Sequence, residues 1–132
     1  MPVLSLQAIE TLCQESLLAV GASEEQAAIV AAEIAEAEAE GIRNVGLGYI
    51  HLYLKHLKVG KVKPNAQPAI VKTSAASTVV DADFGFCHHA YIVGEQRLIE
   101  TAREQGVAML AIHQSSSAGV LGWFVRRLAQ QG

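Results

Sequence analysis

Three adjacent residues, Cys87, His88 and His89, form the densest group of side chains that could bind metal or move protons. Neighbouring residues on a helix point about 100° apart, so two adjacent histidines do not chelate one metal ion. Histidines that share a metal on a helix are typically four residues apart, whereas His51 and His56 are five apart. The spacing therefore predicts no metal site.

A serine-rich run, residues 115–119, follows an apolar segment that ends at His113. Backbone N–H groups at the start of a helix can hold an anion. Ser115, Ser117 and Gly119 are therefore the weak candidates for contacting a bound cofactor. An ordinary strand-to-helix turn explains the same residues, and we favour that simpler interpretation. A lone histidine at the end of a strand is likewise more often structural than catalytic.

Other motifs that carry chemistry are absent from the sequence. There is no G-x-G-x-x-G, no Walker A sequence and no nucleophile elbow. Glu33, Glu36 and Glu40 recur at helical spacing and resemble a carboxylate site. Charged residues at this spacing usually form a solvated helix face, so we expect these glutamates to face water.

The elements that must position these residues fall into two groups. The first sixty residues predict three helices, over 5–20, 23–41 and about 47–60, with Ser5 and Ser23 as N-caps. After Pro68 the pattern changes to short β-branched runs and predicts a β-α-β unit. The expected elements there are strands over 69–71 and 78–80, a helix over 88–105, a buried strand over 107–112 and a helix over 120–130.

The expected fold class is therefore α/β, with an N-terminal helical part of three helices, then a small β-α-β unit and a C-terminal helix. At 132 residues the chain fits one domain, divided into a helical part (1–60) and an α/β part (61–132). A hydrophobic fraction of 51% and a charged fraction of 17% exclude a disordered chain.

Charge and hydropathy limit the partners and the cellular compartment that we expect for this protein. The net charge of −3 argues against nucleic acid, and no apolar run is long enough for a membrane span. No basic leader is visible at the N-terminus. Cys13 and Cys87 are far apart in the sequence, so we expect reduced thiols and a cytoplasmic protein.

Aromatic residues make up only 5% of the chain, which predicts a thin core. Two apolar stripes of the predicted helices would then need cover from outside the subunit. The stripes are Ile9, Cys13, Leu17 and Val20, and Leu47, Ile50, Leu54 and Leu57. We therefore expect a homo-oligomer or a complex with a complementary chain, built on residues 1–60.

The order of several segments resembles the N-terminal part of the malate/L-lactate dehydrogenase-type family of NAD(P)-dependent reductases. That family includes ureidoglycolate, sulfolactate, diketogulonate and cyclic-imine enzymes. Residues 64–68 match its P-x-A-x-P run, residues 80–86 its V-D-G-x-x-G-x segment and residues 115–123 its S-x-H-x-G-x-x-G turn. The remaining matches are residues 38–41, Tyr53, Gly60 and residues 99–107.

The chain departs from the family at the positions that the resemblance makes functional. Val45 stands where the family has a catalytic histidine, Tyr49 at an arginine position, and Ser117 at a second functional histidine. Valine has no proton to transfer, and serine does not replace an imidazole near neutral pH. The resemblance implies NAD(P), but members are longer and bind it mostly beyond Gly132. We thus expect no cofactor on the isolated chain.

Two functional hypotheses follow. The first is a catalytically degenerate, truncated relative of the 2-hydroxy/2-keto acid oxidoreductases that acts as a binding or assembly module. The second is a subunit of a working oxidoreductase whose cofactor site another chain completes. Loss of both imidazoles favours the first hypothesis.

Overall fold

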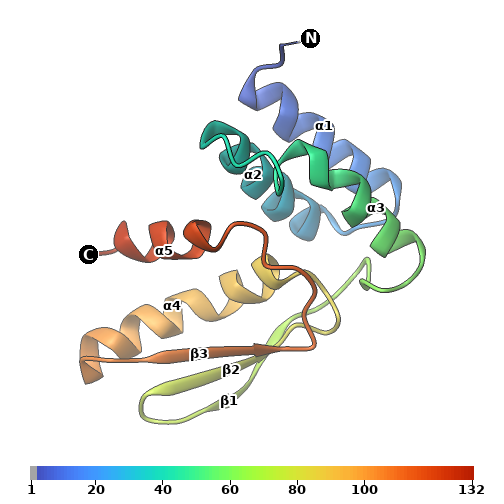
Figure 1. Ribbon diagram of the computed structural model, residues 1–132. Helices are drawn as coiled ribbons and strands as arrows, with labels where there is room; N and C mark the ends of the chain where they lie inside the picture. The colour runs from blue at the N-terminus through green and yellow to red at the C-terminus, as the bar shows by residue number, and fades with distance from the viewer. Residues whose placement is uncertain (1–2) are drawn as a thin grey trace.

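The computed structural model describes residues 3–132, and its order of elements matches the expected α/β class (Figure 1). The helical part comes first, and a small sheet and two further helices follow. The elements are α1 (Leu6–Ala19), α2 (Glu24–Ala39), the 3₁₀ turn η1 (Leu47–Tyr49), α3 (Ile50–Lys58), β1 (Ala69–Thr73), β2 (Ser77–Asp81), α4 (Cys87–Gln105), β3 (Met109–His113) and α5 (Leu121–Ala129). Within residues 3–132, no helix has the length and hydropathy to cross a bilayer.

Local signals account for the first two helices. The side chain of Ser5 accepts a hydrogen bond from the Ala8 N–H, and that of Ser23 accepts one from the Gln26 N–H, as N-caps do. The third predicted helix is divided: a 3₁₀ turn covers residues 47–49 before α3 begins.

The helical part buries its own apolar stripes. Ile9, Cys13, Leu17 and Leu57 belong to one buried cluster with the apolar side of α2, and the other residues of both stripes pack against it. Half of the stripe residues are therefore buried within the chain, and Val20, Leu47, Ile50 and Leu54 are only partly buried. The expectation of association itself stays a prediction.

The sheet has the order β1-β2-β3. β1 pairs antiparallel with β2, with a register shift between Ile70 and Lys72, and β2 pairs parallel with β3. The segment from β2 through α4 to β3 is the β-α-β unit that the sequence predicts. The prediction of a buried strand at 107–112 is wrong in one respect. β3 is an edge strand and is half-exposed, because no described strand covers its other side.

α4 packs on the sheet at a point where only glycine fits. A Cβ atom at Gly94 would lie 2.6 Å from Leu110 Cδ1 and 3.0 Å from Val80 Cγ2. A second buried cluster of Val80, Ala82 and Ala90 forms around this contact. The helix therefore approaches the sheet closely and fixes the position of the segment that follows β3.

Gln26 joins the helical part to the α/β part. Its fully buried side-chain amide donates to the carbonyls of Lys63 and Pro64, at 3.2 and 3.0 Å. Its side-chain oxygen accepts from the Phe86 N–H at 3.0 Å. A polar side chain buried this deeply is tolerated because its hydrogen-bonding groups are used. Gln26 thus ties α2 to the start of α4.

Candidate functional site

The serine run lies between the end of β3 and the start of α5, in the loop of residues 114–120 (the serine loop). Gln114 and Ser117 have φ angles of +51° and +53°, in the left-handed region that such residues seldom adopt. The Ser116 N–H donates to the Gly85 carbonyl at 2.9 Å, and the Ser116 carbonyl accepts from the Cys87 N–H at 3.1 Å. These bonds attach the loop to the start of α4.

Ser117 is bound to the helical part through Tyr53. The hydroxyl groups of Tyr53 and Ser117 lie 3.0 Å apart, and the ring of Tyr53 is fully buried between Tyr49 and Phe86. Burial raises the pKa of Tyr53 to about 12, so the phenol keeps its proton at neutral pH. Two of the three departures from the family, Tyr49 and Ser117, therefore meet at Tyr53.

Val45 lies in the turn before η1 and is half-buried. Its N–H donates to the Ile42 carbonyl at 3.3 Å within the same turn. The turn is anchored by Glu38, whose carboxylate accepts from the Leu47 N–H at 2.7 Å. The side chain of Val45 has no polar atom with which to join the Tyr53–Ser117 pair.

Glu33 corrects the sequence analysis, because it is fully buried rather than solvated. One carboxylate oxygen accepts from the Val120 N–H at 2.9 Å, so Glu33 holds the end of the serine loop from α2. The other oxygen lies 3.8 Å from His88 Nε2 and has no hydrogen-bond partner. A Cβ atom at Gly119 would lie 2.5 Å from Glu33 and 2.8 Å from His88.

Burial disfavours charge on both members of this pair. It raises the pKa of Glu33 to about 7, despite the hydrogen bond from Val120. It lowers the pKa of His88 to about 4. The imidazole is enclosed by Trp123 and Phe124, with ring centroids at 5.4 and 5.6 Å. His88 is thus a neutral, enclosed support for the loop.

The other histidines described here lie outside this group, whereas Cys87 contacts the serine loop. His89 Nε2 lies 3.5 Å from a carboxylate oxygen of Glu25, and His51 and His113 are exposed. Burial raises the pKa of the Cys87 thiol, against a hydrogen bond from Ser115. Across residues 3–132, no three His, Cys, Asp or Glu side chains gather as metal ligands.

α5 is fastened by two arginines that the sequence analysis did not single out. Arg126 pairs with Glu36 at 2.7 Å and also with Glu40. Arg127 makes a bidentate pair with Glu95, at 2.8 and 2.7 Å. Glu36 of α2 and its C-cap Glu40, two of the three glutamates expected to face water, therefore hold α5. The Glu/Arg periodicities alone do not reveal a pairing across about ninety residues of sequence.

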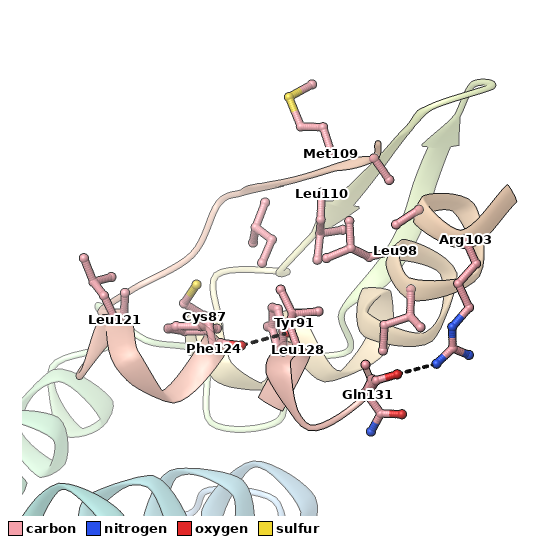
Figure 2. A pocket seen from close by; sticks show the side chains of 16 residues that line it. Cys87, Tyr91, Leu98, Arg103, Met109, Leu110, Leu121, Phe124, Leu128 and Gln131 are labelled. Carbon is pink, nitrogen blue, oxygen red and sulfur yellow. Dashed lines mark hydrogen bonds between the residues drawn. The ribbon is translucent and has the colours of Figure 1, made fainter. Parts of the chain in front are cut away.

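An apolar groove of about 730 Å³ opens beside the serine loop, between α4, β3 and α5 (Figure 2). Most of its lining is aliphatic or aromatic. At one end Arg103 donates to the Gln131 carbonyl at 2.6 Å. The lining includes Tyr91, Leu98, Met109, Leu110, Leu121, Phe124 and Leu128.

The described residues do not fit a whole nicotinamide dinucleotide. Its pyrophosphate needs cations or free N–H groups, and Arg103 is the only cationic side chain among the described residues that line the groove. In the serine loop, the Val120 N–H is bound by a carboxylate and the Ser117 hydroxyl by Tyr53. The candidates Ser115, Ser117 and Gly119 therefore lie in a turn that is bound to the protein.

Comparison with known proteins identifies relatives of this chain. The chain is 38% identical over 110 residues to a delta(1)-pyrroline-2-carboxylate reductase of Ancylobacter novellus, covering 83% of this chain and 32% of that protein. It is 37% identical over 130 residues to a (2R)-3-sulfolactate dehydrogenase (NADP(+)) of Chromohalobacter salexigens, covering 98% and 39%. The chain thus spans well under half the length of these relatives.

The structure agrees with the sequence comparison. A malate dehydrogenase from Entamoeba histolytica superposes with a TM-score of 0.91 at 28% identity, over 99% of this chain and 37% of that one. The sequence model of the family described as malate/L-lactate dehydrogenase matches residues 4–132. The chain belongs to the malate/L-lactate dehydrogenase family, of whose members it covers about a third.

Proposed function

We propose that this chain is a catalytically silent member of its family and acts as a binding or assembly module in the cytoplasm. The proposal is supported mainly by the residues at two positions of the sequence. By the resemblance, Val45 and Ser117 would stand where imidazoles transfer protons. General acid–base groups each contribute about 10²–10⁴-fold to a rate, so the loss of both leaves little catalysis.

The contacts of Ser117 support the proposal. Its hydroxyl pairs with that of Tyr53, which is buried and keeps its proton at neutral pH. A hydroxyl held in this way is a structural link rather than a free acid or base. His88, whose imidazole lies beside Gly119 of the loop, is fully buried and held neutral, so it does not replace the missing groups.

Assays of the purified 132-residue chain test this proposal. The relatives suggest the substrates: 3-sulfolactate with NADP⁺ and Δ¹-pyrroline-2-carboxylate with NADPH, besides pyruvate and oxaloacetate with NADH. The Chromohalobacter salexigens enzyme serves as the positive control for sulfolactate. We expect no turnover above background and no heat of NADH or NADPH binding in calorimetry. Cofactor-dependent turnover by the chain alone would overturn the proposal.

A double variant, Val45→His with Ser117→His, sharpens the test. We expect it to remain inactive, because the described residues do not form a site for the whole dinucleotide. Each single variant serves as its matched control. Clear turnover by the double variant alone would show that this chain holds a usable cofactor site.

The second candidate is a subunit of a working oxidoreductase whose cofactor site another chain completes. The apolar groove favours it, since its open side would accept further polypeptide. This candidate predicts that turnover appears only on mixing with the second chain. The first predicts that the mixture remains inactive.

A further inference from the structure

Several buried polar atoms around His88 have no hydrogen-bond partner within residues 3–132. They are Glu33 Oε2, both ring nitrogens of His88 and Trp123 Nε1. Buried polar groups are nearly always paired, so unpartnered ones require an explanation. Two of these atoms face each other, since Glu33 Oε2 lies 3.8 Å from His88 Nε2 and both side chains are 0% exposed. Because this chain covers both side chains by itself, the pair does not depend on what covers its outer surfaces.

Three consecutive residues of the serine loop contact the pair. The Val120 N–H donates to Glu33 Oε1 at 2.9 Å, and the Ala118 carbonyl opposes the lowering of the His88 pKa by burial. Gly119 lies between them, where a Cβ atom would be 2.5 Å from Glu33 Oε1 and 2.8 Å from His88 Nε2. The position of the loop is therefore coupled to the state of the pair.

A proton between Glu33 and His88 would satisfy both facing atoms. An ionised carboxylate only accepts hydrogen bonds, and so does an imidazole nitrogen that carries no proton. A protonated carboxyl group supplies the donor, and neither group then carries a charge in the buried site. A carboxylate facing a neutral imidazole N–H leaves one buried charge without a counter-charge, and a carboxylate facing an imidazolium buries two charges.

We propose that Glu33 is a neutral carboxylic acid that bridges the serine loop and α4. Its Oε1 accepts from the Val120 N–H, and its Oε2–H donates to His88 Nε2. The two atoms must approach by about 1 Å from their separation of 3.8 Å to form that bond. Glu33 is thus a positioning residue, which holds from α2 the loop that contains Ser117.

The charged and titratable groups around the pair are compatible with a protonated Glu33. Burial, and after it the charge of Glu36 on the same helix, raise the pKa of Glu33 to about 7. Arg126 of α5 is bound to Glu36, at 2.7 Å. Tyr53 of α3 keeps its proton at neutral pH, because burial raises its pKa to about 12.

Infrared spectroscopy of the purified chain at pH 5.5 tests the proton directly. The spectrum of the wild type minus that of Glu33→Gln should contain the C=O stretch of a protonated carboxylic acid. His88→Phe removes the acceptor, so the band should remain but move to the position of an acid that donates no hydrogen bond. Glu10→Gln on α1 is the matched control and should remove no such band.

Amide exchange at Val120 tests the positioning role. Gln keeps an oxygen for the Val120 N–H and an amide N–H for His88, so Glu33→Gln should leave the protection of Val120 within about twofold of the wild type. Met has a similar length but neither group. Glu33→Met should therefore reduce the protection of Val120 by about tenfold or more.

Three results would overturn the proposal. They are the absence of an acid band from the difference between wild type and Glu33→Gln, a band that His88→Phe leaves in place unshifted, and equal loss of Val120 protection in Glu33→Gln and Glu33→Met. Should His88→Phe or Glu33→Met not fold, the ring nitrogens of His88 in the wild type decide. Their ¹⁵N resonances must shift as Glu33 ionises near pH 7, and Glu33→Gln must abolish that shift. These measurements do not involve turnover, so failure here is distinct from failure of the proposed function.

Discussion

The two sides of β3 differ in how completely the chain uses its own interacting groups. At its end, the serine loop is bound by Tyr53, Glu33 and Gly85. Along its edge, backbone groups and apolar side chains remain open. The difference teaches that, within residues 3–132, contacts from the helical part hold the serine loop, whereas no strand pairs with the outer edge of β3.

The largest expected effect comes from removing the hydrogen bonds of the buried Gln26 side chain. Gln26→Leu leaves the Phe86 N–H and two carbonyls without their partners in a buried place, which should cost about 3 kcal/mol of the free energy of unfolding. Chemical denaturation measures this cost. Gln96→Leu, on an exposed face of α4, is the control and should change stability by less than about 0.5 kcal/mol. Equal effects of the two substitutions would contradict the role of Gln26.

A smaller loss is expected at Gly119. Gly119→Ala forces a Cβ atom against Glu33 and His88 at a φ of +56°, which should cost about 2 kcal/mol. Gly122→Ala is the matched control, since its Cβ atom would meet only Val120 at 3.6 Å, inside a helix that favours alanine. Thermal melts of both variants make the comparison. A Gly119→Ala melt as high as that of Gly122→Ala would show that the loop is less tightly bound than described.

The third effect is a change in pH dependence. Burial raises the pKa of Glu33 from 4.5 to about 7, so the contribution of Glu33 to the free energy of unfolding falls as pH rises through that range. Burial lowers the pKa of His88 from 6.5 to about 4, so the contribution of His88 falls as pH decreases through that range. Between pH 4.5 and 6.5 the two slopes oppose each other.

Glu33→Gln should remove one of these slopes. The free energy of unfolding should then rise with pH from 4.5 to 6.5, whereas these two groups leave the wild type nearly flat. Urea melts at several pH values measure the slope, with Glu10→Gln on α1 as the control. A Glu33→Gln profile that parallels the wild type would refute the buried pair.

Local patterns predicted most of the fold but not the contacts of the site. Ser5, Ser23 and the apolar periodicities fixed the helices because caps and amphipathic spacing act within a few residues. Glu33 was misjudged because the N–H that it binds, at Val120, is 87 residues away. A signal was present: Glu33 follows Val30 by three residues and so lies on the apolar face of α2.

The exposure of β3 could not be predicted for a related reason. A continuous apolar run indicates a strand covered on both faces, but it does not say which chain supplies the neighbouring strand. Likewise the pairing of Tyr53 with Ser117 depends on the packing of α3 against a loop 64 residues away. Both features depend on the tertiary arrangement, which the spacing of residues in the sequence does not reveal.

Hydrogen–deuterium exchange with and without NADPH tests the account most directly. We predict that NADPH leaves exchange in residues 114–120 unchanged. Slower exchange in residues 114–120 on adding NADPH would contradict it. The chain would then act through its family site.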